Sequence, residues 1–459
     1  MMATDAVYTT GYSSYPSDRQ PVHWQSVRTN WPDTNLPEGL QLNDYSKSSP
    51  PSLNASVPQS SQHTAGSMES QQFTETEVPR SRSRLGLTAR TPPMSLGNGH
   101  IPDKRNISVA TLHNERYVLD AASIKEHENE DDFLIHPNPY NLCLCVFDGH
   151  DGQNAVRFTS KYLKTRVFDT RSWVEISKTD QQNVMESALV EFIRVTDADF
   201  FKDINHYIAE KRRIQLQIPP GMKSYQAQMT FPTQVARLQE LEKHISGGCT
   251  AVVAILTEKR LYVANLGDSR AILACQASSG ALNVKQLSED HGVENEQEIQ
   301  RLAAIGLDPE QLKRTGRLGT QENTRSIGDY SIKGGYKDVD VICHATCEPG
   351  LAVPHVMSVP VGDPFFKYLI LMSDGVYKTV EAVAGLSSNT GNDILVGIID
   401  QHVERNGFNN NSTAMEILKK IRHIQHDLFQ KSACQDPHSE IAIANRKRDD
   451  MTLLIYKFH

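Results

Sequence analysis

Short uninterrupted apolar runs along this chain alternate with longer segments in which apolar residues return every three or four positions. The short runs predict β-strands, and they cover residues 142–147, 251–256, 261–266, 271–274, 368–372 and 451–456. The periodic segments predict helices, above all at residues 182–208 and 235–245. The charged residues 258–260 between the second and third runs are typical of a hairpin turn. Hairpins with helices grouped between them favour an α+β sandwich, with sheets packed face to face and helices outside them.

Carboxylates stand at the ends of three of these apolar runs. Asp148 and Asp374 each close a run, and the pair Asp449-Asp450 precedes the last one. Three such ends meeting in space would repel one another by several kcal/mol at an effective dielectric near ~20. Bound divalent cations would remove that cost. Because carboxylates are hard oxygen ligands, the pattern predicts a site for Mg²⁺ or Mn²⁺ rather than for zinc.

The N-terminal part of the sequence has a different composition. Residues 1–104 are dominated by Ser, Thr, Pro, Gln and Asn, with few apolar residues to repay the entropy of ordering. We therefore expect a disordered arm, followed by one large domain over residues 105–459. Trp24 and the segment Trp31-Pro32-Asp33 carry the two tryptophans of the arm. They are either incidental or a short docking motif.

The composition limits the classes of partner and the cellular compartment that we expect for this protein. Of the 459 residues, 38% are hydrophobic, which suffices for one large core plus an appendage. The net charge is -8, and the sequence lacks the basic stripe that a nucleic-acid-binding protein would carry. No apolar stretch reaches about 18 residues, so we expect no membrane association. The seven cysteines are an odd number scattered through apolar surroundings. They argue against a disulfide framework and for a reducing, cytoplasmic location.

Seven short motifs follow one another through the domain. They are Phe147-Asp148-Gly149-His150, Ser246-Gly247-Gly248-Cys249-Thr250-Ala251-Val252-Val253, Ala264-Asn265-Leu266-Gly267-Asp268-Ser269-Arg270, Glu289-Asp290-His291, Thr324-Arg325-Ser326-Ile327-Gly328-Asp329, Ser373-Asp374-Gly375 and Asp449-Asp450-Met451-Thr452. In this order they resemble the metal-dependent serine/threonine phosphatases, the PPM or type 2C family. The resemblance covers roughly residues 107–459. It implies a β-sandwich of two antiparallel sheets flanked by helices, with a two-metal site at one edge.

The resemblance also assigns roles to residues of the motifs. Asp148 would bridge two Mg²⁺ or Mn²⁺ ions, Gly149 would offer its carbonyl, and Asp374 and Asp449 would hold the other metal. Two such cations lower the pKa of a bridging water and neutralise charge on a phosphate, so that hydroxide can attack phosphorus. His150 would protonate the serine or threonine oxygen as it leaves.

A phosphate anchor is implied upstream of these motifs. The family carries an arginine in a segment patterned Arg-x-x-x-Glu-Asp, which residues 116–121 match with one acid instead of two. Arg116 would make a bidentate contact with phosphate, and Asp120 would hold a metal-bound water. Arg105 is a rival for the first of these roles.

Some positions depart from the family pattern. Lys378 stands where the enzymes usually carry an aspartate that helps a third, weaker metal, and Asp450 replaces an asparagine. The ammonium of Lys378 would oppose such an ion. Together these departures predict inefficient turnover.

Other segments resemble one branch of the family, a group of pseudophosphatases that bind and activate the transforming growth factor β-activated kinase, a MAP3-kinase. They are residues 295–298, 305–308, 328–340 and 375–378, with the helix at 238–245 and the segment around Trp31. That branch has partly lost its metal aspartates, whereas this protein keeps Asp148, Asp374 and Asp449. The branch also continues into a kinase-binding tail beyond the position of His459, so we expect an incomplete sequence or a different mode of engagement.

Two hypotheses follow. The favoured one is a phosphatase-fold signalling regulator that binds and activates this kinase or a related MAP3-kinase, with a largely retained two-metal site. The alternative is a working Mn²⁺- or Mg²⁺-dependent serine/threonine phosphatase that acts on a phosphoprotein.

Overall fold

The structure is a computed structural model, and it describes most of the residues that follow residue 106. The described residues are 107–113, 117–126, 130–179, 181–362, 365–385, 390–408, 412–435, 438 and 448–459. The expected arm over residues 1–104 lies outside them, as do Arg105 and Arg116. The start of the domain at residue 105 therefore stays a prediction.

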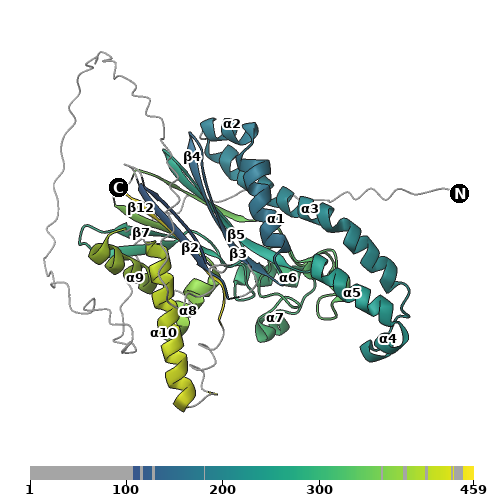
Figure 1. Ribbon diagram of the computed structural model, residues 1–459. Helices are drawn as coiled ribbons and strands as arrows, with labels where there is room; N and C mark the ends of the chain where they lie inside the picture. The colour runs from purple at the N-terminus through teal and green to yellow at the C-terminus, as the bar shows by residue number, and fades with distance from the viewer. Residues whose placement is uncertain are drawn as a thin grey trace, which may run out of the picture. The chain divides into compact units, whose positions relative to one another are not determined.

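Two antiparallel sheets form the centre of the described part (Figure 1). One sheet has the strand order β1 (Ile107–His113), β2 (Tyr117–Ile124), β12 (Met451–Phe458), β11 (Phe366–Met372), β7 (Arg270–Gln276) and β8 (Leu282–Gln286). The other has the order β10 (His355–Pro360), β6 (Arg260–Leu266), β5 (Gly248–Thr257), β4 (Asn141–His150) and β3 (Asp131–Pro137), with the short β9 (Ile327–Gly328) paired to β5.

Strand β4 explains why the central strands read as unbroken apolar runs. Successive side chains of a strand point to opposite faces. Leu142, Leu144 and Val146 belong to the core between the two sheets. Cys143, Cys145 and Phe147 belong to a second core, between their sheet and the helices outside it. Because both faces are buried, the run cannot alternate with polar residues.

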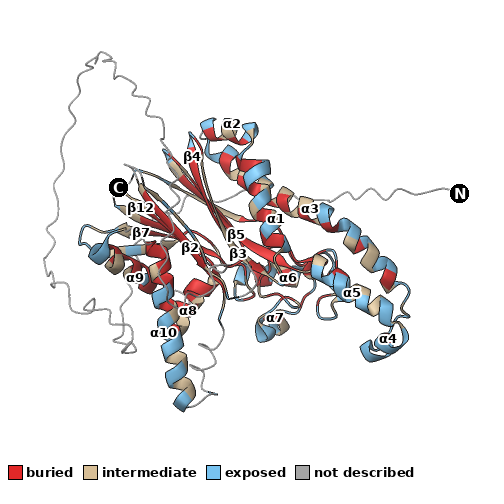
Figure 2. Cartoon of the chain, viewed as in Figure 1, coloured by how far each residue is buried: buried red, intermediate tan, exposed pale blue. Residues whose placement is uncertain are grey.

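Helices cover the outer faces of both sheets. The sheet that contains β4 is covered by α1 (Asn154–Tyr162) and α3 (Gln182–Gln215). Helices α2 (Arg171–Thr179) and α5 (Pro232–Ile245) pack against α3, and η2 (Leu163–Phe168) and α4 (Ser224–Thr230) precede them in the chain. The sheet that contains β12 is covered by α8 (Asp374–Ala384), α9 (Thr390–Asn406) and α10 (Thr413–Gln435). Their buried faces turn toward the sheets (Figure 2). The predicted sandwich of two antiparallel sheets flanked by helices is confirmed.

A smaller cluster lies beside the sandwich. Helices α6 (Glu296–Ala304) and α7 (Pro309–Thr315) pack around a separate apolar core with the short helices η3 (Tyr330–Ile332) and η4 (Tyr336–Asp338) nearby. Asn295 caps α6, because its side chain accepts hydrogen bonds from Gln297 N and Glu298 N. Among the described helices, none combines the length and apolarity that crossing a membrane requires.

Candidate metal centre

Three carboxylates meet at one edge of the sandwich. Asp148 lies near the end of β4, Asp268 lies in the turn between β6 and β7, and Asp374 is the first residue of α8. Ligand oxygens of the three lie within 4.8 Å of one another. Within the described ranges this is the one group of three or more acidic, histidine or cysteine side chains close enough to hold a metal ion. The prediction that distant acids at strand ends gather in space is therefore correct for Asp148 and Asp374.

Asp131 extends this acidic group. It opens β3 and pairs directly with Asp148 in the register between β3 and β4. Its side chain is 1% exposed, yet its Oδ2 atom receives no hydrogen bond from any described residue. Asp450 lies close by, since its Oδ2 accepts from Asp131 N at 3.4 Å. A buried carboxylate oxygen without a donor is costly unless a cation neutralises it.

Charge repulsion inside the group is substantial. Two unit charges 4.8 Å apart repel by about 3 kcal/mol at an effective dielectric of about 20. Burial, together with the charges of Asp374, Asp131 and Asp268, holds the pKa of Asp148 well above its usual value. Burial likewise raises the pKa of Asp131, with Asp450 and Asp374 adding to it. Hard oxygen ligands, excess negative charge and an unpartnered buried oxygen together suit Mg²⁺ or Mn²⁺.

The raised pKa values predict how Mn²⁺ should stabilise the domain as pH changes. The pKa of each of these two acids is higher in the folded than in the unfolded state, so each opposes folding once it ionises. The free energy of unfolding of the metal-free domain should therefore fall as pH rises above about 4. A cation takes the place of the protons. We expect saturating Mn²⁺ to raise the melting temperature more at pH 8 than at pH 6. Thermal unfolding with Mn²⁺ and with a chelator tests this, and an equal gain at both pH values would contradict it.

The other predicted ligands have different surroundings. The Gly149 amide donates to the carbonyl of Glu130 at 2.9 Å, and a Cβ atom at Gly149 would come within 2.4 Å of that oxygen. Only glycine therefore lets β3 approach here. Asp449 lies beside the start of α8, since a Cβ atom at Gly375 would be 3.2 Å from its Cβ. The ligand roles of the Gly149 carbonyl and Asp449 stay predictions.

Asp120 lies in a different environment from the acidic group. It sits within β2, is fully buried, and accepts hydrogen bonds from Thr111 Oγ1, Ser412 Oγ and Ala414 N at 2.9 to 3.0 Å. Its carboxylate therefore caps the N-terminus of α10, where orphan amides need an acceptor. Burial raises its pKa although these hydrogen bonds oppose the rise. We leave Asp120 out of the proposed ligand set; Arg116, its predicted companion, lies outside the described residues.

This environment predicts the effect of Asp120→Asn. The amide keeps one acceptor oxygen but places an NH₂ group against donors, so we expect a loss of about 1–3 kcal/mol in unfolding free energy. Mn²⁺ affinity should not change. Urea unfolding and calorimetry measure the two quantities, and a marked loss of Mn²⁺ affinity would return Asp120 to the metal centre.

His150 is held by an acid that the motif pattern leaves without a role. Its Nε2 atom lies 2.9 Å from both carboxylate oxygens of Asp329. Asp329 is 1% exposed, has a left-handed backbone with φ of 57°, and accepts from the Ser326 hydroxyl. Burial lowers the pKa of His150, but the charge of Asp329 outweighs it and raises that pKa to about 9. The imidazole is thus held as a proton donor next to the acidic group.

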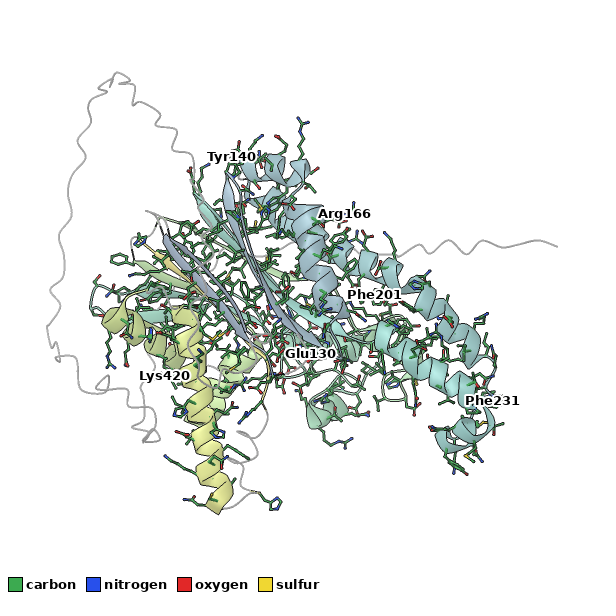
Figure 3. The ribbon with its side chains drawn as sticks, in the orientation of Figure 1. Glu130, Tyr140, Arg166, Phe201, Phe231 and Lys420 are labelled. Carbon is green, nitrogen blue, oxygen red and sulfur yellow. The ribbon has the colours of Figure 1, made fainter. Side chains whose placement is uncertain are left out.

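Lys378 places a positive charge against the acidic group. It lies one turn after Asp374 on α8, and its Nζ atom is 2.5 Å from Asp374 Oδ2 and 3.1 Å from Asp268 Oδ2. Glu322 Oε2 lies 3.4 Å away. Burial lowers the pKa of Lys378, but Asp268 and Asp374 outweigh it and raise that pKa strongly. The ammonium is therefore charged at any physiological pH. Figure 3 shows the side chains of the surrounding sheets and helices, with Glu130 labelled on the segment that leads into β3.

Comparisons with known proteins identify sequence relatives of this chain. A sequence model of one protein family, described as protein phosphatase 2C, matches residues 116–423. A Caenorhabditis elegans protein named TGF-beta-activated kinase 1 and MAP3K7-binding protein 1 is 24% identical over 362 residues, which cover 78% of this chain and 82% of that protein. The probable protein phosphatase 2C 2 of Paramecium tetraurelia is 26% identical over 236 residues, 51% of this chain and 63% of the relative.

Among solved structures, a serine-threonine phosphatase 2C from Toxoplasma gondii aligns with 77% of this chain and 99% of its own, with a TM-score of 0.49 and 15% identity.

Proposed function

Because the chain belongs to the protein phosphatase 2C family, we propose that it is a phosphatase-fold signalling regulator that binds and activates a MAP3-kinase of the transforming growth factor β-activated type. The similarity to the C. elegans kinase-binding protein carries this proposal, since it extends over 78% of this chain and 82% of that relative. Lys378 forms ion pairs with Asp268 and Asp374. These pairs support a regulator, because they neutralise carboxylate charge that an enzyme would use to bind metal. We place its action in the cytoplasm, in keeping with the odd number of cysteines in its sequence, seven.

Co-purification tests the regulator. The full-length protein, expressed with the corresponding kinase of its own organism, should co-purify with it and raise its autophosphorylation. A MAP3-kinase of a different type serves as the control and should not be retained. If both proteins are folded and no complex forms at micromolar concentrations, the proposal fails.

The metal centre is the second part of the proposal. Asp148 and Asp374 would hold Mg²⁺ or Mn²⁺, with Asp131 beside them and with Gly149 and Asp449 as further predicted ligands. Such ions, two in the family pattern, supply an activated water and neutralise phosphate charge. In a regulator the same ions would offset the repulsion among the carboxylates and so stabilise the domain.

A catalytically active serine/threonine phosphatase is the second candidate function. The observation that favours it is the contact between His150 and Asp329, which serves no purpose in metal binding. The imidazolium would donate its proton to the serine or threonine oxygen that leaves phosphorus, and Asp329 would orient the ring and stabilise its charge. A drifting pseudoenzyme has no physical reason to keep a buried acid aimed at this histidine.

A hydrolysis assay decides between the two. A phosphoserine peptide with Mn²⁺ is incubated with the wild-type protein and with Asp374→Ala. An active enzyme should lose most of its hydrolysis rate in Asp374→Ala, because the variant lacks one of the proposed metal ligands. Equal background rates for the two proteins would eliminate the phosphatase hypothesis and leave the kinase-binding proposal untouched.

A further inference from the structure

The acidic group has two sides with different charge compensation. On one side, Asp268 has both carboxylate oxygens engaged: Oδ1 accepts from Asn323 Nδ2 at 3.0 Å, and Oδ2 lies 3.1 Å from Lys378 Nζ. The same ammonium bonds to Asp374 Oδ2. On the other side, the buried Asp131 Oδ2 has no donor among the described residues. The Lys378 ammonium therefore lies on the Asp268 side, whereas the Ser373 and Thr452 hydroxyls give Asp131 hydrogen bonds but no positive charge.

The helix fixes the lysine in this position. Asp374 and Lys378 are four residues apart on α8, so their side chains lie on the same helical face. The neighbouring Tyr377 hydroxyl donates to the backbone carbonyl of Asp268 at 3.1 Å, which holds the Asp268 turn against α8. A short acidic turn, a helix and a lysine thus form one packed unit, and the ammonium is part of it.

We propose that the Lys378 ammonium is a tethered cation that occupies the Asp268 side of the centre and keeps a divalent ion out of it. The argument rests on the proposed metal centre. An ammonium is a monovalent charge permanently attached to the protein, whereas a divalent ion in the same place would need the same carboxylate oxygens. Lys378 therefore sets the number of divalent ions that this centre binds, and confines them to the side of the centre away from Asp268.

Counting bound Mn²⁺ tests the inference. Equilibrium dialysis with Mn²⁺, read by electron paramagnetic resonance of the free ion, gives the number of ions per protein molecule. Lys378→Met keeps the length and apolar stem of the side chain but removes its charge, and it should bind one Mn²⁺ more than the wild-type protein. Lys378→Arg keeps the charge and should bind the wild-type number. Lys367→Met removes a lysine paired with Asp400 outside the centre, and should also leave the number unchanged.

The outcomes are distinguishable. Equal numbers for the wild-type protein and Lys378→Met overturn the inference. If neither binds Mn²⁺, both the inference and the metal centre are refuted, while kinase binding is unaffected. If only the variant binds Mn²⁺, the inference stands and the metal centre of the natural protein does not.

A second measurement covers the possibility that Lys378→Met folds poorly without metal. The variant is then purified in Mn²⁺, desalted, and analysed for retained manganese and for its melting temperature. The inference expects a larger Mn²⁺-induced rise in melting temperature for Lys378→Met than for Lys378→Arg. An equal rise in the two variants would overturn it.

Discussion

Asp148→Asn should bind Mn²⁺ more than about 100-fold more weakly than the wild-type protein, beyond the loss typical of residues that only support a metal ligand. The same variant should be more stable than the wild-type protein when no metal is present. Both effects have one cause. The Asp148 carboxylate is buried among the charges of Asp374, Asp131 and Asp268, so a neutral amide in its place removes the desolvation and repulsion that oppose its ionisation. The asparagine carbonyl can still accept from Asp374 N.

Titration calorimetry measures the affinity, and thermal unfolding in a chelator measures the stability. Asp120→Asn is the matched control, because it also removes one buried carboxylate from a strand but lies outside the acidic group. The two variants should move in opposite directions: Asp148→Asn loses metal and gains metal-free stability, and Asp120→Asn loses stability and keeps metal affinity. Unchanged Mn²⁺ affinity in Asp148→Asn would refute the assignment of Asp148.

Asp329→Asn should lower the pKa of His150 from about 9 toward about 6.5, the ordinary value for histidine. Asparagine tolerates the left-handed backbone at this position, so the substitution removes charge with little strain. A shift of this size corresponds to about 3 kcal/mol. Proton NMR of the His150 imidazole in the metal-free protein measures it directly.

The pH dependence of stability gives a second readout of the same pair. A histidine whose folded pKa is raised contributes stability that is fully present below about pH 6.5 and is lost as pH rises through about 9. The stability difference between wild type and Asp329→Asn should therefore be largest below about pH 6.5, shrink between about pH 6.5 and 9, and vanish above that range. Asp169→Asn, which breaks the exposed contact with His136, is the control and should not move the His150 titration. An unshifted His150 in Asp329→Asn would remove Asp329 as the positioning acid.

The sandwich and half of the acidic group could be predicted from the sequence. Buried strands are apolar on both faces, so β4 is visible as a run, and an acid that ends such a run lies at the edge of a sheet. This reasoning places Asp148 and Asp374 correctly. It applies equally to Asp268, which follows the run at residues 261–266 within one of the seven motifs, although the resemblance gave it no role.

The other parts of the site could not be predicted, because they depend on which residues pair across strands and pack together in the fold. Spacing along the sequence does not contain that information. The match at residues 116–121 put Asp120 in the centre, but β2 continues to Ile124, so Asp120 lies within the strand and faces α10. The acid that lies opposite Asp148 is Asp131, at the start of a strand whose side chains are mostly half-exposed and whose sequence carries no apolar run. The Asp329 contact likewise joins residues 179 positions apart, which only the folded protein reveals.

The glycines at the edge of the sandwich bear on how the centre takes up an ion. A Cβ atom at Gly375 would come within 1.9 Å of the Asp450 carbonyl, and one at Gly149 within 2.4 Å of the Glu130 carbonyl. Close packing between backbone segments at these two glycines therefore fixes the spacing of the neighbouring acids, Asp148 and Asp374, without help from a bound ion. The acidic group is preorganised, so ion binding demands no refolding of the chain around it and its rate should follow the release of water from the cation.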